Sequence, residues 1–393
     1  MGHMKMRAPT TGTRIPVALV GLGLAFRIGT FLLWPVMFLG ILAICGFVVW
    51  GAIETGRYFF LLYILPIPLV GGYICFQAAG LTLKGTGSSE LAMVASKADY
   101  PALWDMAEQC ADMVGAAPPD NILIGMSANF YVTENPVSLL GQWRSPVVEG
   151  RSLYVSAPLL RVMKLDETKA VLAHEFAHFT GRDTVYSTQI APAYASLTSG
   201  IHAIKSQIDW SINGIVLVLP MLITLAYHGM FRILDNAISR RRELRCDEIA
   251  SEVYGRVHIS NGLLKVVGYG NLLSENIDGQ FVSLMRENRT LHNYPEWFSY
   301  FAREESTRSV VSRILSYAAA ARTRAADSHP ALGARLKALN VSSLLRSPDI
   351  DTHYPLSLEF NLEHLEVELT RTYARQLQNY VESELLVNDS CAA

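Results

Sequence analysis

Charged residues are scarce in this chain, and its cysteines form no recognisable pairs. Only 17% of the 393 residues are Asp, Glu, Lys or Arg, and the formal net charge is −2. This balance argues against nucleic acid as a main partner, because such proteins usually carry a basic surface. The five cysteines are scattered, so they predict no disulfide framework, as expected for a cytoplasmic site. The chain also lacks internal repeats and low-complexity tracts, which excludes solenoid architectures.

Long hydrophobic runs, in contrast, are present. Half of the residues are hydrophobic, and both Phe31–Ala52 and Tyr58–Ala79 contain no charge. As a helix, each run is long enough to cross a hydrocarbon core of roughly 30 Å. A short polar turn at residues 53–57 separates them. The sequence therefore predicts a transmembrane hairpin within residues 31–82.

The segment before this hairpin, residues 1–30, is predicted to be a cytoplasmic or interfacial segment. Its apolar run at 15–26 is too short to span a bilayer and is closed by Arg27. The run also lacks the cleavage site between small residues that a signal peptide needs. We therefore do not interpret it as a secretory signal.

Histidine occurs only ten times, which makes one short pattern informative. The chain reads His174-Glu175-Phe176-Ala177-His178. On a helix, residues at i and i+4 share a face, so the two imidazoles could bind one zinc ion. Glu175 would then lie where it can take a proton from the attacking water. The alternative is a pair of core histidines that hydrogen bonds satisfy.

The surroundings of the two histidines favour a helix. Asp166 and Glu167 provide acidic residues at a helix start, and Gly181 provides a stop. Between them, apolar residues recur at helical spacing, which predicts that one face packs against a core. These apolar residues are Val171, Leu172, Phe176 and Phe179.

A third metal ligand is expected in the charged stretch Ser239–Ala250. Glu243 and Asp247 lie at i and i+4, hence on one helix face. Two histidines and Glu243 would leave a fourth zinc position open for water, as catalytic sites require. Asp247 could accept the free ring N–H of a ligating histidine. Taken alone, the stretch would be interpreted as a solvated, charge-rich helix.

With these motifs the chain resembles the membrane-bound gluzincin peptidases, the family of HtpX heat-shock proteases and CAAX prenyl proteases, and most closely the HtpX type. That family has His-Glu-x-x-His, then Ser-Arg-x-x-Glu-x-x-Ala-Asp-x-x-Ala, then a His-Pro element that ends in arginine. The third element here is His329–Arg335, and Cys246 replaces the usual alanine. We interpret Cys246 as a packing residue. The resemblance covers about residues 85–340.

The resemblance implies an α+β, mostly helical fold: a zincin-type metallopeptidase domain with a small antiparallel sheet, plus transmembrane hairpins. The catalytic domain is expected in two parts, 83–183 and 235–340, followed by a helical extension at 341–393. The implied activity is a zinc-dependent endopeptidase with one Zn²⁺ per chain. Its substrates would be proteins or peptides, among them membrane or misfolded proteins, in membrane protein quality control.

Further site residues follow from the resemblance alone. His329 matches a histidine that lies across the cleft and could stabilise the oxyanion of the tetrahedral intermediate. Arg335 is expected to orient that segment through a carboxylate. Ala128 and Asn129 match an edge strand that pairs with extended substrate, although an ordinary sheet strand is an open alternative.

The stretch 184–234 is predicted to form a second membrane hairpin. The uncharged run Ile212–Phe231 lies between the zinc histidines and Glu243. Ligands of one ion cannot lie on opposite sides of a bilayer, so the chain must cross an even number of times between them. The weaker run Thr184–Ile204 would supply the other crossing. A re-entrant hairpin at Ile212–Phe231 is the alternative.

Basic residues predict the orientation of these spans. Lys5, Arg7, Arg14 and Arg27 precede the first crossing, whereas the loop between the first two spans carries only Arg57. A run of arginines also follows the second hairpin. By the positive-inside rule, the N-terminus and the catalytic domain face the cytoplasm. We therefore expect a multi-pass protein of the inner cell membrane, in contact with the lipid bilayer.

One hypothesis from another class is a catalytically silent membrane scaffold or chaperone that keeps zinc for structure. The presence of Glu175 argues against it, because a purely structural site needs no base beside the metal.

Overall fold

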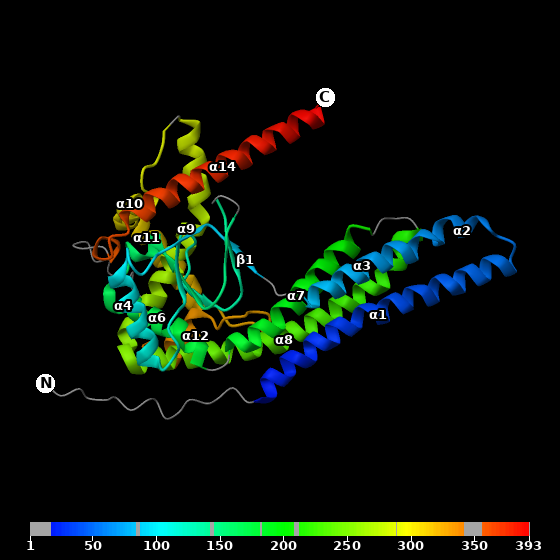
Figure 1. Ribbon diagram of the computed structural model, residues 1–393, viewed down its shortest axis with the longest axis horizontal. Coiled ribbons are helices and arrows are strands. Elements are labelled where there is room, and N and C mark those ends of the chain that lie inside the picture. The colour runs from blue at the N-terminus through cyan, green and yellow to red at the C-terminus, as the bar shows by residue number, and fades with distance from the viewer. Residues whose placement is uncertain are drawn as a thin grey trace. The chain divides into compact units, whose positions relative to one another are not determined.

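Two units make up the chain, and each is assembled from separate stretches of sequence. The computed structural model describes residues 17–83, 87–141, 145–180, 183–207, 212–287, 289–341 and 356–392 (Figure 1). Described residues of Gly87–Gly181 and Ser239–Ala393 form one unit, which we call the sheet unit. Those of Thr13–Thr86 and Arg182–Ile238 form the other, the helical unit. The basic residues Lys5, Arg7 and Arg14 lie outside the described residues.

The helical unit contains the apolar runs of the sequence. Its helices are α1 (Val17–Glu54), α2 (Phe59–Ile64), α3 (Pro66–Leu83), α7 (Asp183–Lys205) and the first part of α8 (Ile212–Tyr254). Among the described residues, three stretches are long and apolar enough to cross a membrane: Gly21–Glu54, Leu61–Leu83 and Leu217–Tyr254. The predicted first hairpin thus coincides with α1 to α3. A second hairpin stays a prediction, with α7 and α8 at the expected places.

Helices α1, α3 and α7 pack against one another, and Figure 1 shows them side by side. Their shared core is apolar and includes Trp34, Ile41 and Leu197. Trp34 donates its indole N–H to Ser196 Oγ at 2.8 Å, and Ser196 donates to the carbonyl of Ala78 at 2.6 Å. This hydrogen-bonded chain links the three helices without burying a charge.

Arg27 lies inside α1, so the helix runs through the residue that was expected to close the first apolar run. Its Nε donates to the carbonyl of Thr82 at 2.8 Å, and Nη1 donates to Gln189 Oε1 at 3.1 Å. Thr82 lies in the last turn of α3, where carbonyls have no helical partner and a cation is favoured. These contacts explain why a charge does not end α1.

The sheet unit is mostly helical and carries two small sheets. Its longer helices are α4 (Pro101–Val114), α6 (Leu165–Thr180), the last part of α8, α9 (Arg256–Arg286), α10 (Tyr294–Arg303), α11 (Glu305–Ala320) and α14 (Glu363–Ala392). The short ones are α5 (Ala157–Leu160), α12 (Leu332–Ala338) and α13 (Leu356–Glu359). This arrangement confirms the predicted α+β, mostly helical class.

The sheets are mixed, whereas the sequence predicted one antiparallel sheet. One has the order β2 (Ala92–Val94), β3 (Asn121–Gly125), β7 (Ser152–Ser156), β4 (Tyr131–Thr133); the other has the order β1 (Ser88–Glu90), β5 (Val137–Leu139), β6 (Val147–Val148). Strands β3 and β7 run parallel, while β2 and β4 are antiparallel to their partners. The parallel pair is possible because the chain between β3 and β7 is long enough to return to the same end.

Helix α6 carries the two predicted zinc histidines and forms for the expected reasons. It contacts α4 and α9, and its apolar residues Val171, Leu172 and Phe176 are buried. At its start, Glu167 accepts the backbone N–H of Lys164 at 2.9 Å and pairs with Lys265 of α9 at 2.7 Å. The buried pair fixes α6 against α9, since neither charge could remain buried alone.

The predicted C-terminal extension is part of the core of the sheet unit. Leu362, Leu365 and Leu369 belong to the same buried cluster as α6. Glu366 of α14 is fully buried, accepts Arg161 Nε at 2.9 Å, and also accepts the side-chain amide of Asn293 at 2.8 Å. The first turns of α14 are therefore integral to the fold.

Candidate metal centre

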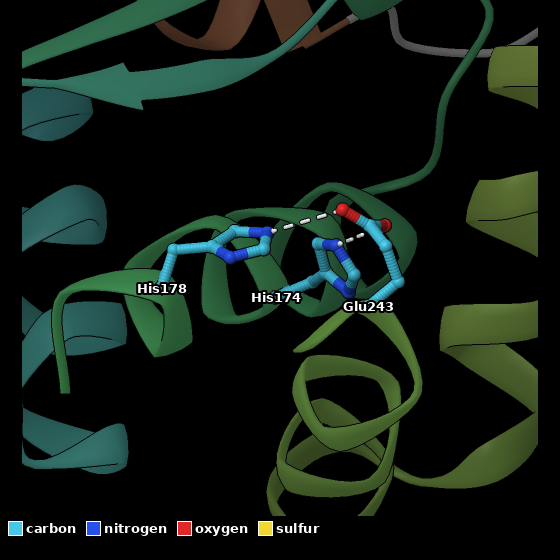
Figure 2. Close-up of side chains that lie close together, drawn as sticks. All are labelled: His174, His178 and Glu243. Carbon is cyan, nitrogen blue, oxygen red and sulfur yellow. Dashed lines mark ion pairs between the residues drawn. The ribbon is translucent and has the colours of Figure 1, made fainter. Parts of the chain in front are cut away.

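Three potential metal ligands converge from two helices. His174 and His178 project from one face of α6 toward Glu243 of α8, as Figure 2 shows. His174 Nε2 lies 3.5 Å from Glu243 Oε2, and His178 Nε2 lies 3.6 Å from Glu243 Oε1. One ligand atom from each residue lies within 4.8 Å of the other two. The structure thus brings together the three residues that the sequence singled out.

The geometry fits a zinc ion. Nitrogen and oxygen ligands bind zinc at about 2.0–2.1 Å, so neighbouring ligands of a tetrahedral site lie roughly 3.3 Å apart. The two distances from Glu243 to the histidines, 3.5 and 3.6 Å, agree with this value. Two imidazoles also favour zinc over magnesium or calcium, which prefer oxygen ligands. Three protein ligands leave one position of the tetrahedron open.

Behind His174 lies a carboxylate that an arginine holds in place. His174 Nδ1 lies 2.9 Å from Asp247 Oδ1, so the opposite nitrogen faces the centre. Arg335 Nε donates to Asp247 Oδ2 at 2.7 Å, and Nη2 donates to Oδ1 at 2.6 Å. This two-pronged pairing fixes the carboxylate plane and hence the imidazole. The predicted roles of Asp247 and Arg335 agree with these contacts.

The electrostatics of His174 reflect the surrounding acids. Burial alone would lower its pKa, but the contacts with Asp247 and Glu243 raise the pKa of His174 to about 10. Burial also acts against Arg335, yet the charge of Asp247 raises the pKa of Arg335 further. The carboxylates of Asp247 and Glu243 thus favour the positively charged form of His174, and the same negative charges would favour a bound cation.

His178 is supported by a thiol instead of a carboxylate. Cys246 Sγ lies 3.5 Å from His178 Nδ1, the ring nitrogen that does not face Glu243. Cys246 is fully buried, as expected for a packing residue, and does not belong to the group of candidate ligands. The contact between Cys246 and His178 was not predicted from the sequence. The position of Cys246 next to Asp247 in α8 is the signal that could have indicated it.

Glu175 lies between the two histidines in sequence and shares their environment. Its side chain is partly buried, and burial raises the pKa of Glu175 above its ordinary value. The charges that act on it include those of His174, His178 and Glu243. A carboxylate with a raised pKa beside a metal site is suited to accept and release a proton.

His329 reaches the same centre from the loop before α12. Its Nδ1 lies 3.3 Å from Glu243 Oε1, and its side chain is 65% exposed. His329 therefore approaches the ligand set from the solvent side, whereas Asp247 lies behind it. The structure thus places His329 next to the three candidate ligands, and its catalytic role stays a prediction.

Ala128 and Asn129 lie in the bend between β3 and β4, not within a strand. Asn129 is exposed, and its Oδ1 accepts the backbone N–H of Phe130 at 2.9 Å. Strand β4 starts two residues later, at Tyr131, forms one edge of its sheet and contacts α6. An edge strand thus lies beside the histidine helix, shifted along the chain from the predicted pair.

Another contact that sequence reasoning missed joins the two helices of the centre. Arg245 of α8 donates Nη2 to the carbonyl of Ala177 in α6 at 3.3 Å. Ala177 lies in the last turn of α6, whose carbonyls lack helical partners. No motif points to this pair, because a side chain that bonds to backbone leaves no pattern at the accepting residue.

The chain is similar to several known proteins. Residues 147–342 match the model of Peptidase family M48. The chain is similar to a protease HtpX homolog of Gemmatimonas aurantiaca, 26% identical over 213 residues that cover 52% of this chain and 70% of the relative. A protease HtpX homolog of Pyrococcus furiosus is 28% identical over 187 residues, 44% of this chain and 59% of that relative.

The homolog from Thermoplasma volcanium is 25% identical over 248 residues, 59% of this chain and 73% of the relative. The chain thus spans between about three fifths and three quarters of the length of these relatives. Among solved structures, S. mikatae Ste24p aligns with 83% of this chain and 66% of its own chain, at 17% identity and a TM-score of 0.31.

Proposed function

We propose, from the premise that this chain belongs to peptidase family M48 and is a membrane zinc metallopeptidase, that it is an endopeptidase with one zinc ion per chain. His174, His178 and Glu243 would hold the ion. The observation that carries the proposal is the convergence of these three side chains next to Glu175. A site with three ligands and an adjacent base suits hydrolysis better than structural support.

Each residue has a chemical task in this proposal. Zinc, when bound, polarises the scissile carbonyl and lowers the pKa of water toward about 7. Glu175 takes the proton of the attacking water and passes it to the leaving amine, for which its raised pKa is suited. Asp247, held by Arg335, keeps the tautomer of His174 that presents Nε2 to the centre.

His329 is proposed as the donor that stabilises the oxyanion of the tetrahedral intermediate. Its exposed side chain lies at the solvent side of the ligand set, where a substrate carbonyl would arrive. An aimed hydrogen-bond donor of this kind contributes typically 10²–10³ to kcat.

Substrates are proposed to bind as extended segments along β4, near Ala128 and Asn129. The support is the position of β4 at a sheet edge in contact with α6. An edge strand presents unpaired backbone groups that a peptide can pair with. Such recognition tolerates many side chains and suits unfolded or misfolded protein substrates, including membrane proteins.

The proposed location is the inner cell membrane, with several crossings and the sheet unit on the cytoplasmic side. The apolar helices support insertion into a lipid bilayer, and the arginines after the second apolar stretch support the orientation. In that location the enzyme would act in quality control of membrane proteins.

The decisive experiment replaces Glu175 by Gln in the detergent-solubilised full-length chain. We expect kcat on casein or a fluorogenic peptide to fall by about 10²–10⁴ while metal analysis still finds one zinc per chain. A zinc-loaded variant that cleaves as fast as the parent would exclude the peptidase mechanism. That result would favour the alternative, a scaffold that keeps zinc for structure.

A further inference from the structure

One face of α8 carries, besides the candidate ligand Glu243, two further residues of interest. Arg240, Glu243 and Asp247 are spaced i, i+3 and i+7, which places them on one stripe of the helix. Glu243 and Asp247 are buried at the centre, and Arg240 is half-buried one turn earlier. Its neighbour Arg241 points to another face and is exposed. The same face of α8 therefore also carries Arg240, one turn before Glu243.

Arg240 binds the backbone of the loop that carries His329. Its Nη1 donates to the carbonyl of Asp327 at 2.7 Å. The same nitrogen lies 3.2 Å from the carbonyl of Ala325 and 3.3 Å from that of Arg324. Three carbonyl dipoles therefore point at one cationic group, and hydrogen bonds to a charged donor are stronger than neutral ones.

The turn that Arg240 binds is shaped by its own side chains. The Asp327 carboxylate accepts the backbone N–H of Arg324 at 2.7 Å, which closes the turn internally. Residues 321–326 are exposed, so burial in a core does not hold them. The guanidinium contributes three contacts between this turn and α8.

Beyond His329, further contacts hold the chain, and one of them joins it to the turn. Ala331 donates its backbone N–H to Thr323 Oγ1 at 2.8 Å, and Pro330 is buried. At Gly333 a Cβ would clash with the carbonyl oxygen of Ala319, so α12 can approach the end of α11 this closely only with glycine there. His329 therefore lies between an anchor at α12 and the turn that Arg240 holds.

We propose that Arg240 is a positioning residue that sets the place of His329 relative to the metal ligands. The inference rests on the proposed catalytic role of His329. Arg240 acts through the backbone of the turn and touches neither metal ligands nor substrate in this role. Without it, the turn loses the three contacts between its carbonyls and the guanidinium of α8, so the chain before His329 is held less firmly than the chain after it. Small displacements of a catalytic group lower the rate strongly.

The test compares Arg240→Ala, Arg240→Lys and the control Arg241→Ala in the full-length enzyme. We expect Arg240→Ala to lower kcat by about 10- to 100-fold, with KM and zinc content unchanged. Arg240→Lys should restore part of kcat, because its ammonium also offers three donors. Arg241→Ala should equal the parent, since its side chain is exposed on another face.

A double-mutant cycle with His329→Ala separates this inference from the proposed function. If Arg240 acts through His329, the double variant should be about as slow as His329→Ala alone. Losses in kcat that multiply, or a parent-like Arg240→Ala, would overturn the inference. If His329→Ala itself retained full activity, the proposed role of His329 would fail instead. Should Arg240→Ala not fold, Arg240→Gln enters the same cycle, and the same outcomes decide.

Discussion

The two units bury different kinds of polar group, although both are mainly helical. Among the described residues, every buried charged side chain belongs to the sheet unit, including Arg161, Glu366 and Lys265. In the helical unit, the buried polar side chains among the residues whose burial is described are uncharged, such as Thr30, Ser196 and Thr224. Most of the exposed large hydrophobic side chains, in contrast, belong to the helical unit.

This difference follows from the solvent that each unit meets. A unit surrounded by lipid places apolar side chains outward, and a charge inside it would be costly without water or a partner nearby. A unit surrounded by water must place its apolar side chains inward, and it can stabilise buried charges by pairing them. Buried ion pairs therefore link the helices of the sheet unit, whereas the helices of the helical unit are linked by hydrogen bonds to uncharged partners.

The largest effect should come from breaking a charge pair in the sheet unit. Glu366→Ala leaves Arg161 buried without a partner, which should destabilise the protein by about 3–5 kcal/mol. Thermal unfolding of the solubilised protein measures this loss. The double variant Arg161→Met, Glu366→Leu should recover most of it. A Glu366→Ala protein as stable as the parent would contradict the assigned role of the pair.

A smaller effect is expected in the helical unit. Ser196→Ala removes the acceptor of the Trp34 indole N–H and the donor to Ala78. Hydrogen bonds between membrane helices contribute about 0.6 kcal/mol on average, so the unfolding free energy should fall by roughly that amount. Unfolding in mixed micelles would measure it, with Ala193→Ser as a matched control on α7. If Ser196→Ala lowered the unfolding free energy as much as Glu366→Ala, the two units would not differ in how strongly their polar contacts stabilise them.

The smallest effect concerns a charge pair on the surface of the sheet unit. Hydrogen bonds from Arg151 lower the pKa of Asp120 to about 2. An unfolded aspartate titrates near 3.9, so the pair stabilises the fold above that pH and loses its effect as the pH falls through about 2. Because the pair is exposed, Asp120→Asn should cost only about 0.3 kcal/mol at pH 7, and less at pH 3. A cost that does not fall with pH would contradict this assignment.

The metal centre could be predicted from the sequence because its constraints are local. His174 and His178 are four residues apart in a helix, so they share one face of it. Glu243 and Asp247 are also four residues apart and share one face of another helix. The helix signals around them, from Asp166 to Phe179, are also local. Only the proximity of the two helices had to be inferred. It followed from the requirement that ligands of one shared ion lie close together.

Other features could not be predicted, because they depend on contacts between distant residues. The direction of β7 relative to β3 depends on the path of the intervening chain, which no residue pattern specifies. The burial of Glu366 depends on Arg161, far away in sequence, so the sequence predicts a helical extension at 341–393 without its place in the core. The contacts of Arg240 are to backbone carbonyls, which carry no sequence signal.

The order of residues along the chain determines when the candidate ligand set becomes complete during synthesis. His174 and His178 are synthesised before the stretch Arg182–Ile238 of the helical unit, and Glu243 only after it. A ribosome-bound chain that has not yet produced this stretch therefore has both imidazoles but no carboxylate to complete the ligand set. With Glu243 as the proposed third ligand, a chain that ends before α8 lacks part of the site that hydrolysis requires, so peptide cleavage must await the synthesis of α8.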